Sequence, residues 1–180
     1  FAFVIVTIYL LLKGIRAKMS FLGKVKKKLR NGSWYPFYNT FYEKNNLDPH
    51  MILLESRSGK ALESNILSLL KELCQEPYRS FTLVLSVHRD SENEIKEKLQ
   101  KNSIQGVHFV RTGSVAYYHA LSRAGYLVND TSFPGRFIKK EGQIYLNTWH
   151  GTPLKKMGRD NRPEMVTMGN VQRNLLDSDY

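Results

Sequence analysis

The chain has 180 residues, of which 42% are apolar, with one cysteine and a formal net charge of +11. This length suits one domain with an appendage, and the apolar fraction excludes a wholly disordered protein. A single cysteine excludes a disulfide framework and a cysteine-rich zinc site. Residues 1–30 hold eight of the 27 basic residues and no acidic residue, so the rest of the chain is nearly balanced in charge. Because this charge lies at one end, without a groove-reading motif, we expect no nucleic-acid partner.

The first 49 residues have the pattern of a membrane-associating segment. Phe1 to Leu12 is an apolar run interrupted only by Thr7, and the cationic stretch Lys13–Arg30 follows it. The run is shorter than the roughly 20 residues that span a bilayer, so it could end a longer span or lie on the surface. The order of the two stretches predicts a cytoplasmic, peripheral or anchored protein on an anionic membrane surface. The aromatic residues between 34 and 42 favour the headgroup zone. The alternative is a buried amphipathic helix followed by an aromatic loop of the core.

Residues 50–180 alternate between strand-like and helix-like segments. Short apolar runs predict strands, and apolar residues spaced three or four apart predict helices. This alternation predicts an α/β fold with a Rossmann-like parallel sheet, whose ligands bind beyond the carboxyl ends of the strands. Ser91 and Glu94 have the spacing of a capping box. The expected strands are Met51–Glu55, Phe81–Val87, Val107–Val110, Tyr126–Asn129 and Gln143–Trp149, and the expected helices are Leu62–Leu73, Ser91–Lys101, Ser114–Ala124 and Val166–Leu176.

The turn after the first expected strand is a candidate phosphate-binding turn. It contains Ser58, Gly59 and Lys60, and a small turn before a helix can offer backbone N–H groups to an anion. The spacing of a P-loop is absent, so an ordinary strand-to-helix turn is the alternative. No two histidines have the spacing of metal ligands, and no carboxylates cluster near them. We therefore expect neither a metal nor a cofactor.

The segment after the last expected strand carries the most informative chemistry. His150 follows that strand, where an imidazole could accept a proton from a hydroxyl. Pro153 suits the first position of a new helix. A base, an anion cradle and positive charge are the parts needed to move a phosphoryl group onto an alcohol, and a structural turn is the alternative. The expected cradle residues are Gly151, Thr152, Lys155 and Lys156.

The stretch from Asn129 to Gly158 resembles a known family. It contains Phe133-Pro134, Lys139-Lys140 and the run from Tyr145 to Gly158, with Trp-His-Gly-Thr-Pro-Leu-Lys at its centre. This pattern is similar to the CDP-glycerol:poly(glycerophosphate) glycerophosphotransferases, the teichoic acid primases and polymerases. The turn around Ser58 and the residue Asn65 also resemble the family, although Ser64 and Ile66 depart from its usual Asp-Asn-Pro.

The resemblance implies the acceptor-side front half of a GT-B fold, with the donor-binding half missing from this chain. It implies that His150 is the general base. This base would take a proton from a hydroxyl of a lipid-linked acceptor, which would attack CDP-glycerol or another CDP-alditol and release CMP. We expect this fragment alone to be inactive. Two alternatives remain, a GT-B glycosyltransferase that uses a nucleotide sugar and a non-catalytic, membrane-tethered fragment.

Overall fold

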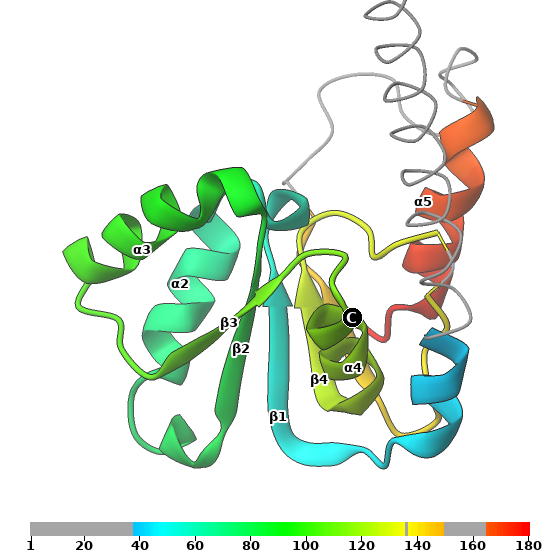
Figure 1. Ribbon diagram of the computed structural model, residues 1–180, viewed down its shortest axis with the longest axis horizontal. Coiled ribbons are helices and arrows are strands. Elements are labelled where there is room, and N and C mark those ends of the chain that lie inside the picture. Colours follow the sequence, from blue (N-terminus) through cyan, green and yellow to red (C-terminus); the bar gives the residue numbers. More distant parts are fainter. Residues whose placement is uncertain (1–37, 136, 150–164) are drawn as a thin grey trace, which may run out of the picture. The chain divides into compact units, whose positions relative to one another are not determined.

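The computed structural model describes residues 38–135, 137–149 and 165–180 (Figure 1). The chain divides into two compact units, Phe1–Asn39 and Thr40–Tyr180, and the helices and strands named below belong to the second unit. The apolar and basic runs before residue 31 lie outside the described residues. So do five of the predicted site residues, His150, Gly151, Thr152, Lys155 and Lys156. Across the described ranges, no helix is both long enough and apolar enough to cross a membrane.

A five-stranded parallel sheet forms the centre of this unit. Its strand order is β3-β2-β1-β4-β5, with every neighbouring pair parallel. The chain therefore builds outward from β1 in one direction and then, from β4, in the other, which is the doubly wound arrangement. This finding confirms the expected α/β class and parallel sheet. The strands are β1 (Asp48–Glu55), β2 (Thr82–Val87), β3 (Val107–Arg111), β4 (Ala124–Asn129) and β5 (Ile144–Asn147).

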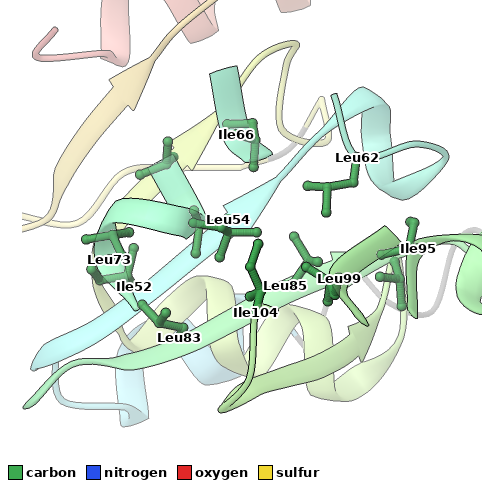
Figure 2. Packing of buried hydrophobic residues seen from close by; sticks show 13 residues of the cluster. Ile52, Leu54, Leu62, Ile66, Leu73, Leu83, Leu85, Ile95, Leu99 and Ile104 are labelled. Atoms are coloured by element: carbon green, nitrogen blue, oxygen red, sulfur yellow. The ribbon is translucent and has the colours of Figure 1, made fainter. Parts of the chain in front are cut away.

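One face of the sheet is covered by α2 (Ser64–Leu73) and α3 (Glu92–Lys101) (Figure 1). The apolar residues of α2 recur at helical spacing, and Leu62, Ile66 and Leu70 are almost fully buried. They belong to the same core cluster as Leu54 of β1 and Leu85 of β2, and Figure 2 shows this cluster. Burying a Leu or Ile side chain contributes about 1.5–3 kcal/mol, so this layer is the main source of stability on that face.

The opposite face carries α4 (Val115–Arg123), which links β3 to β4. Leu53 and Leu127 point to this face and are fully buried, as are Tyr117 and Leu121 of α4. Helix α4 begins at a true cap, because the side chain of Ser114 accepts a hydrogen bond from the N–H of Tyr117. Covering both faces explains why strands β1 and β2 read as continuous apolar runs.

The chain ends beside the outer edge of the sheet. Helix α5 (Met165–Asp177) leads to residues 178–180. The Tyr180 carbonyl accepts from the N–H of Asn147 at 2.9 Å, and the Tyr180 N–H donates to the Tyr145 carbonyl at 3.3 Å. This pair of bonds is the pattern of parallel strands, so Tyr180 lies next to Leu146 of β5.

Three local expectations are wrong. Strand β5 ends at Asn147, not Trp149, because the Asn147 side chain accepts the Trp149 N–H and turns the chain. Ser91 precedes α3 but its side chain makes no capping hydrogen bond. Strand β1 begins at Asp48, not at Met51, so it is three residues longer than expected.

Candidate functional site at the carboxyl edge of the sheet

A row of polar side chains crosses the sheet at its carboxyl edge. Glu55 on β1 is in register with Ser86 on β2 and with Asn129 on β4, and Asn129 is in register with Asn147 on β5. Residues in register on parallel strands point to the same face, so the four side chains form one row. Ser86, Glu55 and Asn129 are buried. The row crosses the point between β1 and β4 where the strand order reverses, which is where doubly wound domains bind ligands.

The turn after β1 has an unusual backbone. Arg57, Ser58 and Gly59 all have positive φ angles, of 49°, 54° and 78°. Such angles cost on the order of 1–3 kcal/mol for a residue with a side chain and cluster at functional sites. Only glycine fits the third position. A Cβ on Gly59 would clash with Thr112 Oγ1 and lie 2.8 Å from the His88 backbone nitrogen.

Asp130, directly after β4, holds this turn in place. Its Oδ2 accepts from the Ser56 hydroxyl at 2.7 Å, and its Oδ1 accepts from the Arg57 N–H at 2.8 Å. The Ser56 hydroxyl oxygen in turn accepts from the N–H of Glu63, which precedes α2. One carboxylate therefore connects the ends of β1 and β4 with the start of α2. Hydrogen bonds to a charged group contribute about 1.5–3 kcal/mol each, enough to offset the backbone cost of the turn.

Glu55 is the second buried acid at this edge, and its surroundings favour the protonated form. The pKa of its carboxyl is raised to about 7, mainly by burial and to a smaller extent by the neighbouring Asp130 charge, against the lowering effect of hydrogen bonds with the Ser86 and Tyr117 side chains. Its Oε2 atom has no hydrogen-bond partner among the described residues. A carboxyl that titrates near neutrality at a ligand-binding edge marks a functional-site candidate.

The end of β5 is held by two asparagine side chains, one on β5 and one on α2. The Trp149 N–H donates to Asn147 Oδ1 at 3.0 Å, and Asn147 Nδ2 donates to the Thr131 carbonyl at 3.1 Å. The Trp149 carbonyl accepts from Asn65 Nδ2, in the first turn of α2, at 3.4 Å. The last described residue before His150 therefore lies beside the N-terminus of α2.

In the predicted phosphate-binding turn, the backbone N–H groups differ from expectation. The N–H groups of Gly59 and Lys60 already bond to the carbonyls of Ser56 and Arg57, so they are not the open donors that the turn's composition suggested. Ser58 and Lys60 are exposed. The turn therefore offers an anion a hydroxyl and an ammonium group.

The structure adds site residues that sequence reasoning did not select. Asp130 and Glu55 read as strand-end residues, and only the sheet order brings their carboxylates together. In the sequence, the polar pair Asn129-Asp130 at the end of an apolar strand was the pattern that could have indicated a site there.

His88, after β2, caps a short turn and accepts the Asp90 N–H at 3.4 Å. Within the described residues, no three His, Cys, Asp or Glu side chains are grouped so as to hold a metal ion.

The fold and its polar carboxyl edge place this chain in the class of doubly wound α/β domains, in which ligands bind beyond the carboxyl ends of the strands. Within that class, residues 37–180 match the model of the CDP-Glycerol:Poly(glycerophosphate) glycerophosphotransferase family. This match covers most of the chain, and the chain belongs to that family.

Relatives and solved structures agree with this assignment. The teichoic acid poly(glycerol phosphate) polymerase of Staphylococcus epidermidis is 31% identical over 123 residues, which are 68% of this chain and 16% of the relative. The teichoic acid glycerol-phosphate transferase of Staphylococcus aureus is 28% identical over 137 residues, 76% of this chain and 33% of the relative. The structure of the wall teichoic acid polymerase TagF is similar with a TM-score of 0.66 and 25% identity, over 92% of this chain and 40% of TagF. A second TagF structure, soaked with CDPG, gives a TM-score of 0.67. The chain thus spans a minor part of the length of each of these proteins.

Proposed function

We propose that this chain is the acceptor-side half of an enzyme that transfers glycerol phosphate, or a related alditol phosphate, from a CDP-alditol to a hydroxyl of a lipid-linked acceptor. CMP is the leaving group, and the product is a teichoic acid-type polymer. The observation that carries the proposal is the run Trp149-His150-Gly151-Thr152-Pro153, which continues from the carboxyl end of β5 in a chain of this family.

In the proposed reaction His150 is the general base. Its imidazole accepts the proton of the acceptor hydroxyl, and the oxygen forms a new bond to the β-phosphorus of the CDP-alditol. The bond from that phosphorus to the bridging oxygen breaks, and CMP leaves with the electron pair. Negative charge spreads over the phosphoryl oxygens, so cationic and amide donors stabilise the transition state. The donors that we assign are Ser58, Lys60, Gly151, Thr152, Lys155 and Lys156, and not Gly59, because its N–H already bonds to the Ser56 carbonyl.

The described geometry supports an anion at this edge. The positive end of α2 points to it, and the side chain of Asn65 in its first turn reaches the Trp149 carbonyl. Ser58 and Lys60 are exposed on the neighbouring turn. Because the sheet order places β1, β4 and β5 side by side, the turn after β1 and the chain after β5 leave the same edge.

The proposal extends to the rest of the protein and to its location. A second half, as in GT-B enzymes, supplies the donor-binding surface. Residues 1–30 associate with the anionic cytoplasmic face of the cell membrane through their apolar and cationic runs. That location brings the site to a lipid-linked acceptor, which cannot leave the bilayer.

The experiment is a CMP-release assay on the full-length protein. Purified protein is mixed with CDP-glycerol and a lipid-linked acceptor in vesicles, and parallel reactions receive CDP-ribitol or UDP-sugars. We expect acceptor-dependent release of CMP from a CDP-alditol and no release of UDP. Release of UDP with transfer of the sugar would instead establish the glycosyltransferase alternative, and release of neither nucleotide would favour a non-catalytic role.

A further inference from the structure

Trp149, the residue before the proposed base, has a backbone conformation that a tryptophan rarely adopts. Its φ angle is +51°, in the left-handed region. For a bulky L-residue this conformation costs about 1–2 kcal/mol and needs surroundings that impose it. The residue is half-buried and follows the last strand of the sheet.

Two asparagines hold the peptide groups on either side of the Trp149 Cα. The N–H that precedes it donates to Asn147 Oδ1 at 3.0 Å, and the carbonyl that follows it accepts from Asn65 Nδ2 at 3.4 Å. The Thr148 hydroxyl also lies 3.4 Å from that carbonyl. Because φ and ψ describe the rotation of these two peptide groups about the Cα, fixing both groups fixes the conformation of Trp149.

The asparagine on β5 is itself locked in orientation. Asn147 Nδ2 donates to the Thr131 carbonyl at 3.1 Å and to the Tyr145 hydroxyl at 3.3 Å, so its Oδ1 must face the Trp149 N–H. The Tyr145 hydroxyl donates to Asn129 Oδ1 at 2.9 Å. Tyr145 and Asn129 are fully buried. These buried hydrogen bonds restrict the Asn147 and Tyr145 side chains to one arrangement, while Asn129 Nδ2 has no hydrogen-bond partner among the described residues.

We propose that Asn65 and Asn147 are positioning residues that hold Trp149 in its left-handed conformation and so direct the chain from β5 towards His150. Neither side chain contacts the reacting atoms in this role. The consequence for catalysis rests on the proposed function, whereas the claim about Trp149 does not.

The test combines a spectroscopic readout with kinetics on the full-length protein. Tryptophans are replaced by 5-fluorotryptophan, and the 19F resonance of Trp149 is assigned by its loss in Trp149→Phe. The variants are Asn65→Ala, Asn147→Ala and Asn147→Ser. Alanine is the best helix former, so Asn65→Ala leaves α2 intact. The serine hydroxyl can accept the same N–H more weakly, which offers partial rescue.

Asn102→Ala is the matched control. Asn102 also bonds a backbone carbonyl, that of Lys98 at 2.7 Å, but at the end of α3 and away from β5. We expect the Trp149 resonance to shift or broaden in Asn65→Ala and Asn147→Ala, less in Asn147→Ser, and not in the control. We expect kcat for CMP release to fall about 10- to 100-fold in the two alanine variants, with a nearly unchanged KM for the CDP-alditol.

Each outcome decides the proposal. An unchanged Trp149 resonance in either alanine variant overturns the role of that asparagine, even if the protein has no transferase activity. A shifted resonance with unchanged kcat in an active enzyme overturns the link to catalysis. A rise in KM alone would show a binding role and not a positioning one.

Discussion

At the scale of single residues, the two buried acids of the carboxyl edge, Asp130 and Glu55, differ in how far hydrogen-bond donors compensate their negative charge. Both oxygens of Asp130 accept from donors of the turn after β1, so its carboxylate is compensated. Glu55 is as deeply buried, but its Oε2 lacks such a donor among the described residues. Burial without compensation favours the neutral acid. Glu55 therefore lowers the stability of the folded protein whenever it is ionised.

This difference predicts a pH dependence of stability. The pKa of Glu55 rises from its ordinary value of 4.5 to about 7 on folding, so the folded state binds its proton more tightly than the unfolded state. Stability then falls as the pH rises from 4.5 to 7, by about 3 kcal/mol for this group, and the full penalty applies above pH 7. Glu55→Gln should remove this loss. The measurement is the free energy of unfolding in urea, determined between pH 5 and 8 for the native protein and for Glu55→Gln.

The control for Glu55→Gln is Glu94→Gln, on the exposed side of α3. This substitution should leave the pH dependence of unfolding as it is in the native protein. If Glu55→Gln also leaves it unchanged, Glu55 does not titrate near neutrality in the folded protein.

Sequence reasoning reached only part of the site at this scale. The motif after β5 predicted His150 and its neighbours, because their types and order are specific. Asp130, Glu55 and Asn65 were not assigned roles, because their importance depends on contacts between residues 73 or more positions apart or on burial. The positive φ angle of Trp149 could not be predicted either, since no local sequence preference predicts a left-handed tryptophan.

At the scale of elements, α5 is tied to the sheet through one buried asparagine. Asn174 Oδ1 accepts from the Phe133 N–H at 2.8 Å and lies 3.3 Å from the Tyr145 hydroxyl oxygen, and its Nδ2 donates to the Phe133 carbonyl at 3.4 Å. Phe133, Phe137 and Tyr145 form an aromatic cluster around it. The side chain thus satisfies both backbone groups of a buried residue between β4 and β5.

Replacing Asn174 by alanine should therefore loosen this region. The change leaves the buried N–H and carbonyl of Phe133 without this partner, at about 1–3 kcal/mol for each group. We expect faster hydrogen exchange in residues 131–135 and in the second half of α5, with unchanged exchange in α3, measured by mass spectrometry. Equal exchange in Asn174→Ala and the native protein would show that α5 is held by other contacts.

Periodicity predicted the helices and strands well and their ends less well. The expected helix over 62–73 is α2 from Ser64, and the expected strand over 107–110 is β3. Strand β5 is shorter than its apolar run because the Asn147 side chain competes with the ladder for the Trp149 N–H. The order of the strands could not be deduced from spacing alone, and that order brings Asp130 to the turn after β1.

At the scale of the whole molecule, the chain accounts for only part of the proposed enzyme. It covers 40% of TagF and 33% or less of the two curated relatives described above. The described unit supplies a strand edge, an anchored turn and the start of the His150 segment. In the proposed enzyme, a second half provides the surface for the CDP-alditol, and the apolar and cationic runs of residues 1–30 keep the acceptor side at the membrane.

The most direct measurement is acceptor-dependent CMP release by the full-length enzyme and its His150→Ala variant. Loss of a general base lowers the rate by roughly 10²–10⁴-fold, and we expect a fall in that range with folding intact. His88→Ala is the matched control, because His88 also follows a strand at the carboxyl edge, and it should stay within a few-fold of the native rate. A native rate in His150→Ala would contradict the assignment of His150 as the base of this reaction.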